Sequence, residues 1–382
     1  MKPPPDWDPL SPEVLRDQRA AYDKMRECCP VAYSDLMQWS LFRHRDVLRA
    51  LHDTESFSNA VSSHLSVPNG MDPPEHTEYR RAIEKYFEPR RMAEFESNLR
   101  EIAAALVHAA LAEGEVELMD AMALPFAARA QCAFLGWPPD LGEMLVRWTE
   151  QNSQAIRCQD RSAVSQLARE FEAIIAGVLE ERLRSGATPD DDVTTGLMHE
   201  KVWGRPFSNE EIVSVLRNWT VGEIGSIASA IGILAHFLAQ DNELQQQLRA
   251  QPVLLPVAID EILRIHGPLI SSRRIALRDI EIGGRKIAAG ERVTLHWIAA
   301  NRDGDVFEEP ETFRWDRDAS KNLLYGAGIH VCPGAPLARL ELRVVMEELL
   351  SQTALWEFAP DRPPVAAVYP ASGFASLWLQ MR

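Results

Sequence analysis

A long apolar segment near the middle of the chain constrains the fold more than any other feature. Ser208 lies three residues before Glu211, which is the spacing of a capping box at the start of a helix. A helical pattern continues from about Asn209 to Gln240, a length of ~45 Å at the usual rise per residue. Residues 221–238 present no net polar face, so we expect this part to be buried on all sides. The other elements must then pack around a central helix.

The rest of the chain predicts a mainly α protein with a small β region, an α+β fold. Strands are expected near 31–42 and 273–297, and the second stretch includes a hairpin around Gly283-Gly284 and a strand at 293–297. The length of 382 residues allows two ordinary domains or one large one, and we predict a single domain over residues 1–382. Helical patterns cover three further segments, 11–26, much of 76–200, and 335–351.

Composition and charge exclude several classes of protein. Apolar residues make up 46% and charged residues 25%, which are ordinary globular values. The net charge of −16 would repel nucleic-acid phosphates and anionic membranes, so neither is an expected partner. The five cysteines are odd in number and include no CxxC pair, which argues against a disulfide framework or a zinc ribbon. Without a leader pattern or a run of about eighteen uncharged apolar residues, we expect a cytoplasmic protein. We also expect it to be a monomer.

The segment from Tyr325 to Ala335, YGAGIHVCPGA, carries the strongest chemical signal. Its glycines allow positive φ angles and a close approach of the backbone to another group. Cys332 stands at the end of this loop and just before a predicted helix, whose amino end favours a thiolate suited to a soft metal. On residue types alone, an inert cysteine buried in a turn remains the alternative.

This segment resembles the haem-binding signature of the cytochrome P450 family, with Tyr325 in place of the usual phenylalanine. The resemblance implies the cytochrome P450 fold, with the long central helix over a haem b (iron protoporphyrin IX). It also implies that Cys332 is the proximal iron ligand, whose electron donation favours cleavage of the O–O bond. His330 would point to a haem propionate, and a solvent-exposed loop histidine is the alternative.

Further matches to the family follow in the expected order. Glu261 and Arg264, three residues apart on a helix, resemble the ExxR pair and would join Arg317 in a network that braces the haem loop. The resemblance implies a structural role for this network.

The implied propionate contacts come from other parts of the chain. The resemblance implies that His76 and Arg80, one helical turn apart, both reach propionates. Arginine suits this role because its guanidinium can bind a carboxylate through two hydrogen bonds. Arg274 would hold the other propionate, although its neighbour Arg273 leaves that assignment open.

The long helix departs from the family pattern. The acid–alcohol pair that usually relays protons to bound oxygen is replaced by Ile224 and Gly225, while Glu223 precedes and Ser226 follows. In one interpretation a helix bulge or shifted register aims Glu223 or Ser226 at the oxygen pocket as proton relay or substrate anchor. In the other, Glu223 pairs with a structural arginine and Gly225 only makes room for substrate or water.

The resemblance implies a monooxygenase that inserts one oxygen atom from O₂ into a small apolar organic substrate. Electrons would come from a separate ferredoxin or flavodoxin with its NAD(P)H reductase, since no dinucleotide fingerprint follows a strand. A peroxide-driven or rearranging haem-thiolate enzyme and a non-catalytic haem-binding module are the alternatives. A positive docking face for an acidic electron donor is a further hypothesis, built on Arg80, Arg81, Arg90, Arg91, Arg339 and Arg343.

Overall fold

The predicted central helix is present and starts where the capping box places it. In a computed structural model, which describes residues 3–382, helix α10 covers Asn209–Ala239 without a break. Both halves of the box form, because Glu211 N donates to Ser208 Oγ over 3.2 Å and Ser208 N donates to Glu211 Oε2 over 2.8 Å.

Burial along α10 is less uniform than expected. Residues 227–235 are buried, but Val221, Gly222 and Gly225 are exposed, so the expectation of burial on all sides is wrong for the first part of the segment. By length and composition α10 could cross a membrane, yet 61% of its most apolar window is buried inside the protein. That is the behaviour of a core helix.

The contacts divide the chain into two units, and each is described by itself. The first unit holds the chain up to His64 together with Asn69–Asp72 and Val257–Cys332. The second holds Leu65–Pro68, Pro73–Pro256 and Pro333–Arg382. The single domain over residues 1–382 stays a prediction.

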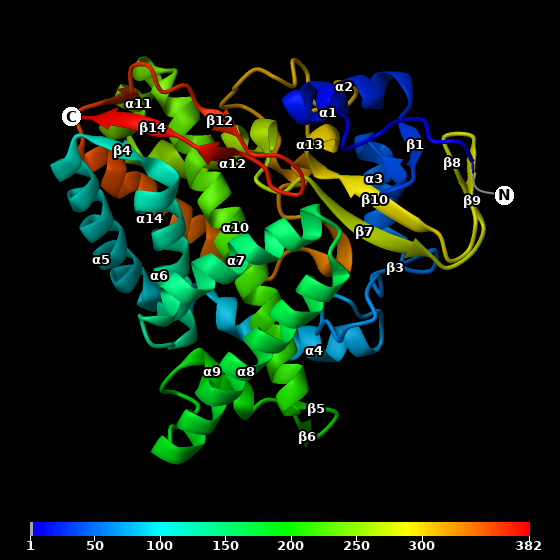
Figure 1. Cartoon of the computed structure of the whole chain (residues 1–382), viewed down its shortest axis with the longest axis horizontal. Coiled ribbons are helices and arrows are strands. Elements are labelled where there is room, and N and C mark those ends of the chain that lie inside the picture. Colours follow the sequence, from blue (N-terminus) through cyan, green and yellow to red (C-terminus); the bar gives the residue numbers. More distant parts are fainter. Residues whose placement is uncertain (1–2) are drawn as a thin grey trace. The chain divides into compact units, whose positions relative to one another are not determined.

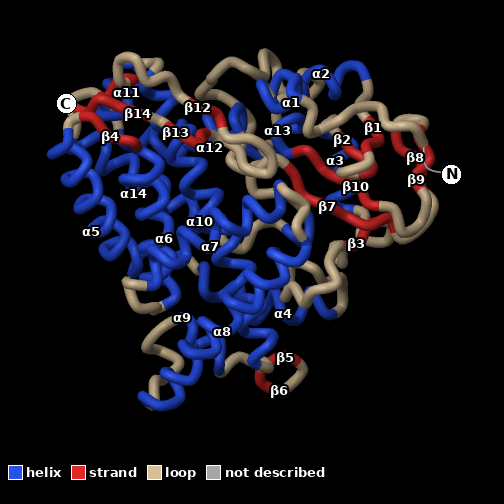
Figure 2. The backbone as a smooth tube through the Cα atoms, in the orientation of Figure 1, coloured by secondary structure: helices blue, strands red, loops and turns tan. Residues whose placement is uncertain are grey.

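The first unit is built on a five-stranded sheet with the strand order β1-β2-β10-β7-β3 (Figure 2). Strands β2 and β10 are parallel, with Trp39 opposite Val293, and the other neighbours are antiparallel. The strands are β1 (Val31–Ser34), β2 (Gln38–Leu41), β3 (Phe57–Ser58), β7 (Ser271–Ala276), β8 (Ile280–Ile282), β9 (Arg285–Ile287) and β10 (Arg292–His296). The helices are α1 (Pro12–Arg16), α2 (Gln18–Cys28), α3 (His44–His52), α12 (Leu255–His266, which starts at the boundary) and α13 (Trp297–Ala300).

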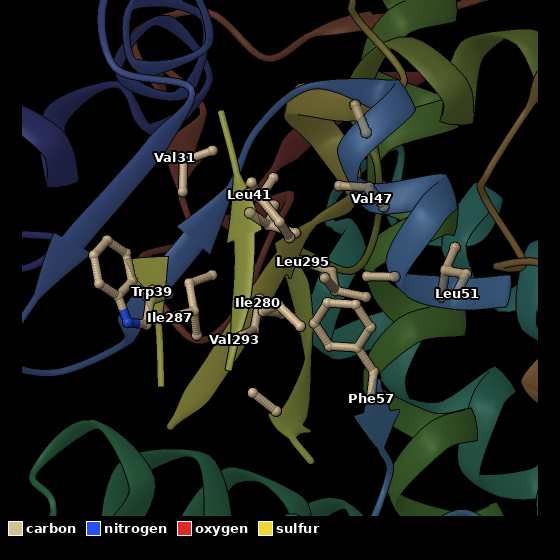
Figure 3. Close-up of a cluster of buried hydrophobic side chains, with 14 of the residues drawn as sticks. Val31, Trp39, Leu41, Val47, Leu51, Phe57, Ile280, Ile287, Val293 and Leu295 are labelled. Carbon is tan, nitrogen blue, oxygen red and sulfur yellow. The ribbon is translucent and has the colours of Figure 1, made fainter. Parts of the chain in front are cut away.

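Apolar side chains of this sheet form a core with α3. Leu41 and Leu295 of the sheet gather with Val47 and Leu51 of α3 in one buried cluster (Figure 3). The alternation of side chains along a strand places such residues on one face, where burying them stabilises the unit.

Two boundaries in this unit differ from the sequence prediction. The helix expected over 11–26 is two helices, because Asp17 leaves the helical conformation and its side chain caps α2 by accepting from Ala20 N over 3.1 Å. The strand expected at 293–297 ends at His296, and Trp297 begins α13. The hairpin around Gly283-Gly284 is confirmed as β8–β9, with positive φ at both glycines.

The second unit is mainly helical, and α10 lies among its helices (Figure 1). Helix α14 packs on both α5 and α10. On α5 the buried Leu99, Ala103, Leu106 and Ala110 recur every three or four residues, so one face of that helix is apolar.

The elements of the second unit follow the order of the chain. Its helices are α4 (Glu75–Glu84), α5 (Pro89–Glu113), α6 (Leu124–Leu135), α7 (Leu141–Arg157), α8 (Arg161–Ser185), α9 (Val193–Met198), α10, α11 (Asn242–Ala250) and α14 (Ala335–Gln352). Its strands are β4 (Glu115–Glu117), β5 (Lys201–Val202), β6 (Arg205–Pro206), β11 (Trp356–Phe358), β12 (Val365–Ala366), β13 (Phe374–Ser376) and β14 (Trp378–Met381).

Candidate functional site

The residues singled out from the sequence fall in both units. The first unit holds Cys332, His330 and Arg274, and the second holds His76, Arg80, Glu223, Gly225 and Ser226.

The cysteine loop of the first unit is tightly folded. Cys332 N donates to Tyr325 O over 2.9 Å, and this hydrogen bond closes the loop. Cys332 itself is exposed. Gly326 and Gly328 have φ angles of +74° and +69°, as expected for a loop that needs left-handed residues. A Cβ at Gly328 would lie 2.3 Å from Leu51 O of α3, so the loop rests directly on that helix. His330 ends a 3₁₀ turn at Gly328–His330, and its propionate contact stays a prediction.

The predicted bracing network is confirmed. The Arg264 guanidinium donates to both carboxylate oxygens of Glu261, from Nε over 2.7 Å and from Nη2 over 2.8 Å. Arg317 Nε donates to Glu261 Oε1 over 3.1 Å. The side chains of Arg264 and Glu261 are 1% and 4% exposed, so this ion pair is buried. A buried pair is stable only when its charges are in close, hydrogen-bonded contact, as they are here.

This network ties helix α12 to the irregular segment before the cysteine. Arg264 Nη1 also donates to Asn301 O over 2.6 Å. Arg317 Nη2 donates to the carbonyl oxygens of Glu309 and Thr312 over 2.7 and 2.9 Å. The long loop that the sequence predicted after Asn301 is therefore anchored by buried charge.

Arg274, on β7, is a buried cation. It is 5% exposed, and its guanidinium Nη1 donates to Ser272 Oγ over 3.1 Å and to Arg273 O over 2.8 Å. Burial lowers its pKa to about 10, while the nearby charge of Asp72 opposes that shift. Over residues 3–382 no carboxylate lies within ion-pair distance of Arg274. A buried guanidinium of this kind fits the carboxylate of a ligand, and a haem propionate has that chemistry.

In the second unit, His76 and Arg80 lie one turn apart on α4. His76 is 3% exposed. Arg80 Nε donates to Glu84 Oε1 over 2.7 Å, so this guanidinium already has one carboxylate partner on its own helix. Their predicted propionate contacts stay predictions.

On α10, the partner of Glu223 differs from what either interpretation of the departure from the family pattern expected. The predicted bulge is wrong, because α10 is continuous through Glu223. The predicted arginine partner is also wrong within the described chain, since the only charged group that shifts the pKa of Glu223 is Glu341 of α14. Ser226 Oγ donates to the carbonyl oxygen of Gly222, one turn back, so this hydroxyl is used within the helix. A Cβ on Gly225 would meet nothing within 4 Å, which is consistent with a residue that makes room.

Sequence reasoning missed Glu341. A signal was present, because Leu337, Glu341 and Val345 recur every four residues on the buried face of the last helix. A carboxyl at an apolar position of an amphipathic helix marks a buried polar group that needs an explanation.

The proposed docking cations are largely paired with acids. Arg90 Nε donates to Glu94 Oε1 over 2.8 Å, and Arg343 Nη2 donates to Glu96 Oε2 over 2.7 Å. The positive face inferred from the sequence is therefore mostly neutralised, and it does not support the docking hypothesis.

Comparisons with known proteins give consistent results. A family model described as "Cytochrome P450" matches residues 232–366. The putative cytochrome P450 YjiB of Bacillus subtilis is 30% identical over 345 residues, covering 86% of each chain. Linalool 8-monooxygenase of Pseudomonas putida is 29% identical and covers 84% of each chain. The crystal structure of CYP109E1 from Bacillus megaterium in complex with testosterone has a TM-score of 0.84 at 26% identity, covering 98% of this chain and 99% of that one.

Proposed function

Because the chain belongs to the cytochrome P450 family, and is therefore an oxidoreductase of the monooxygenase type, we propose that it inserts one atom of O₂ into an uncharged apolar small molecule. The family, the mainly α fold with a small β region and the enzyme class expected from the sequence are confirmed. The substrate class, the electron donor and the residues of the site are the parts we propose.

We propose haem b as the cofactor, with Cys332 as its iron ligand. A thiolate-ligated haem supplies the iron at which O₂ is reduced and the O–O bond is cleaved. The observation that carries this assignment is the closed loop that presents Cys332, with its thiol-bearing residue exposed and its backbone fixed by Tyr325 O and Leu51. His330, Arg274, His76 and Arg80 would hold the propionates, as cations or hydrogen-bond donors.

Arg274 offers a test of this cofactor assignment that does not depend on turnover. Replacing it by leucine removes a buried charged donor, and we expect haem to transfer to excess apomyoglobin about tenfold faster or more. Arg273→Leu, one residue away on the same strand, is the matched control. Equal rates of haem loss in Arg274→Leu and the parent would refute the role of Arg274.

We propose an uncharged, largely apolar substrate. The relatives named above include an enzyme for linalool and one bound to testosterone, and both molecules are uncharged. On α10 the exposed surface around Val221, Gly222 and Gly225 is also apolar. Titration of the purified protein with terpenes, steroids and fatty acids, followed by the shift of the Soret band, tests this proposal. We expect terpenes or steroids to shift the band, and a response to charged molecules alone would contradict it.

We propose that electrons arrive from a separate ferredoxin or flavodoxin and its NAD(P)H reductase, in the cytoplasm of a bacterial cell. Similarity to bacterial relatives supports this setting. A surrogate ferredoxin system is expected to drive turnover of a substrate found in the titration.

One observation favours a second candidate, a peroxide-driven enzyme. The Ser226 hydroxyl is engaged by its own helix, and Gly225 lacks a side chain, so the usual acid–alcohol pair is not formed here. Product formation with hydrogen peroxide but not with the ferredoxin system would select that candidate.

A further inference from the structure

Glu223 and Glu341 form a buried pair of carboxyl groups between α10 and α14. The two helices pack on each other within the second unit, and the carboxyls lie within hydrogen-bond reach of one another. Glu341 is fully buried, whereas Glu223 is partly exposed. Apart from the other member of the pair, no N–H or O–H group of the described residues donates a hydrogen bond to either oxygen of Glu341 or to Oε1 of Glu223.

The surrounding charges cannot neutralise this pair. Arg100 of α5, which packs on α14, is already paired with Glu347 and Glu348. Arg249 of α11 donates to the carbonyl oxygen of Leu350 instead. Among the described residues, the only charged group that perturbs the pKa of either member of the pair is the other member.

Two carboxylates in contact and away from water repel each other strongly, and burial alone already disfavours each charge. A single proton between them removes both problems, since the protonated carboxyl donates a hydrogen bond to its ionised partner. We propose that Glu223 and Glu341 share one proton at neutral pH, and that this pair supplies protons to the reaction on α10. The second part rests on the proposed monooxygenase function.

Burial and contact together indicate which member keeps the proton. The pKa of Glu341 is raised by burial and further by the charge of Glu223. The pKa of Glu223 is raised by burial, but the hydrogen bond from Glu341 opposes that shift. Glu341 is therefore the resident acid, and Glu223 is the ionised acceptor.

The position of Glu223 supplies a way out for the proton. Although Oε1 of Glu223 is buried, the residue as a whole is partly exposed, and Gly222 and Gly225 beside it leave open space where side chains would otherwise stand. Insertion of one oxygen atom consumes one O₂, two electrons and two protons, and it yields the hydroxylated product and one water. The pair gives up one of these protons through Glu223, becomes doubly ionised, and takes up a proton from solvent to return to its starting state.

The shared proton has a signature in stability as well as in spectra. Between the pKa of the carboxyl in the unfolded chain and its higher pKa in the folded protein, only the folded state keeps the proton. Over that range the folding equilibrium constant falls about tenfold for each unit by which the pH rises. The direction follows because the unfolded chain releases the proton near pH 4.5 while the folded chain keeps it. Stability relative to a variant that lacks the pair should thus fall as pH rises.

The experiment compares the holoenzyme with Glu341→Gln, Glu223→Gln and a control, Glu347→Gln, which lies on the same helix but pairs with Arg100 and Arg343. Infrared spectra at pH 7–8 should show the carbonyl band of one protonated carboxylic acid, shifted in D₂O, in the parent and the control. The band and the tenfold-per-unit pH dependence should both disappear in the variant that carries Glu341→Gln and Glu223→Gln together. In each single variant the remaining carboxyl is still buried, and burial still raises its pKa, so we expect the band to shift in frequency because that acid has lost its ionised partner. A band that persists in the double variant, a band whose frequency neither single change shifts, or no such band in the parent would overturn the shared proton.

The role in the reaction is tested separately. With haem incorporation unchanged, product formation in Glu341→Gln should fall on the order of a hundredfold, with the missing electrons recovered as hydrogen peroxide. Unchanged coupling in Glu341→Gln would refute the proton-supply role while leaving the shared proton intact. Absence of product from the parent with every electron source would instead contradict the proposed function, and the infrared result would stand.

Discussion

Glu261 provides a sharp test of the idea that buried charge holds the cysteine loop. Its carboxylate receives three hydrogen bonds from guanidinium groups, two from Arg264 and one from Arg317. Glu261→Gln keeps the shape but removes the charge and one acceptor oxygen, which leaves the nearly inaccessible Arg264 without an anion. Breaking a buried pair in this way costs about 3–5 kcal/mol.

The loss in the free energy of unfolding is measured by urea denaturation, monitored by tryptophan fluorescence and circular dichroism. It equals the change in the midpoint multiplied by the slope m. The control is Glu308→Gln, because Glu308 is an 82% exposed partner of Arg314 and surface pairs contribute about 0–1 kcal/mol. Combining Glu261→Gln with Arg264→Met should cost less than the sum of the two single changes, since the uncompensated charge is then removed. A loss below about 1 kcal/mol for Glu261→Gln, or strict additivity in the double variant, would refute the reasoning.

Two further predictions concern the first unit. His296 is fully buried against Phe42, at a centroid distance of 4.3 Å, and burial lowers its pKa to about 3. Because the unfolded chain binds the proton near pH 6.5, the free energy of unfolding should fall by about 1.4 kcal/mol per pH unit as pH falls from about 6.5 towards 3. His296→Phe should flatten this slope when the free energy is measured by urea titration. An unchanged slope would contradict the burial of a neutral imidazole. Gly328→Ala forces a Cβ to within 2.3 Å of Leu51 O at a φ of +69°, so we expect thermal unfolding to report a loss of about 1–3 kcal/mol. Gly284→Ala has a similar φ but open space and should cost less, and equal losses in the two variants would show that the contact with α3 is unimportant.

The sequence predicts those parts of the fold that depend on local patterns. The capping box at Ser208 and Glu211 places the start of α10, and the paired glycines at 283 and 284 place a hairpin. The break at Asp17 was missed because no glycine or proline marks it, and only the side-chain cap of Asp17 does. The exposure of Gly222 and Gly225 was missed because periodicity reports polarity and not which neighbours are present.

In the candidate site, too, the sequence predicts contacts set by local spacing but not those set by tertiary packing. The bracing of Glu261 by Arg264 and Arg317 follows from spacing and resemblance, and the contacts confirm it. The partner of Glu223 could not be found in this way, because Glu341 lies 118 residues further along the chain on another helix. Such a pair depends on tertiary packing, which a single sequence does not report.

The most direct measurement is the absorption spectrum of the reduced protein with carbon monoxide, before and after Cys332→Ser. We predict the Soret band of a thiolate-ligated haem in the parent protein, and its replacement by the band of a haem without a thiolate in the variant. A parent protein that takes up haem but never shows the thiolate band, or a variant that retains it, would contradict the assignment of Cys332 as the iron ligand.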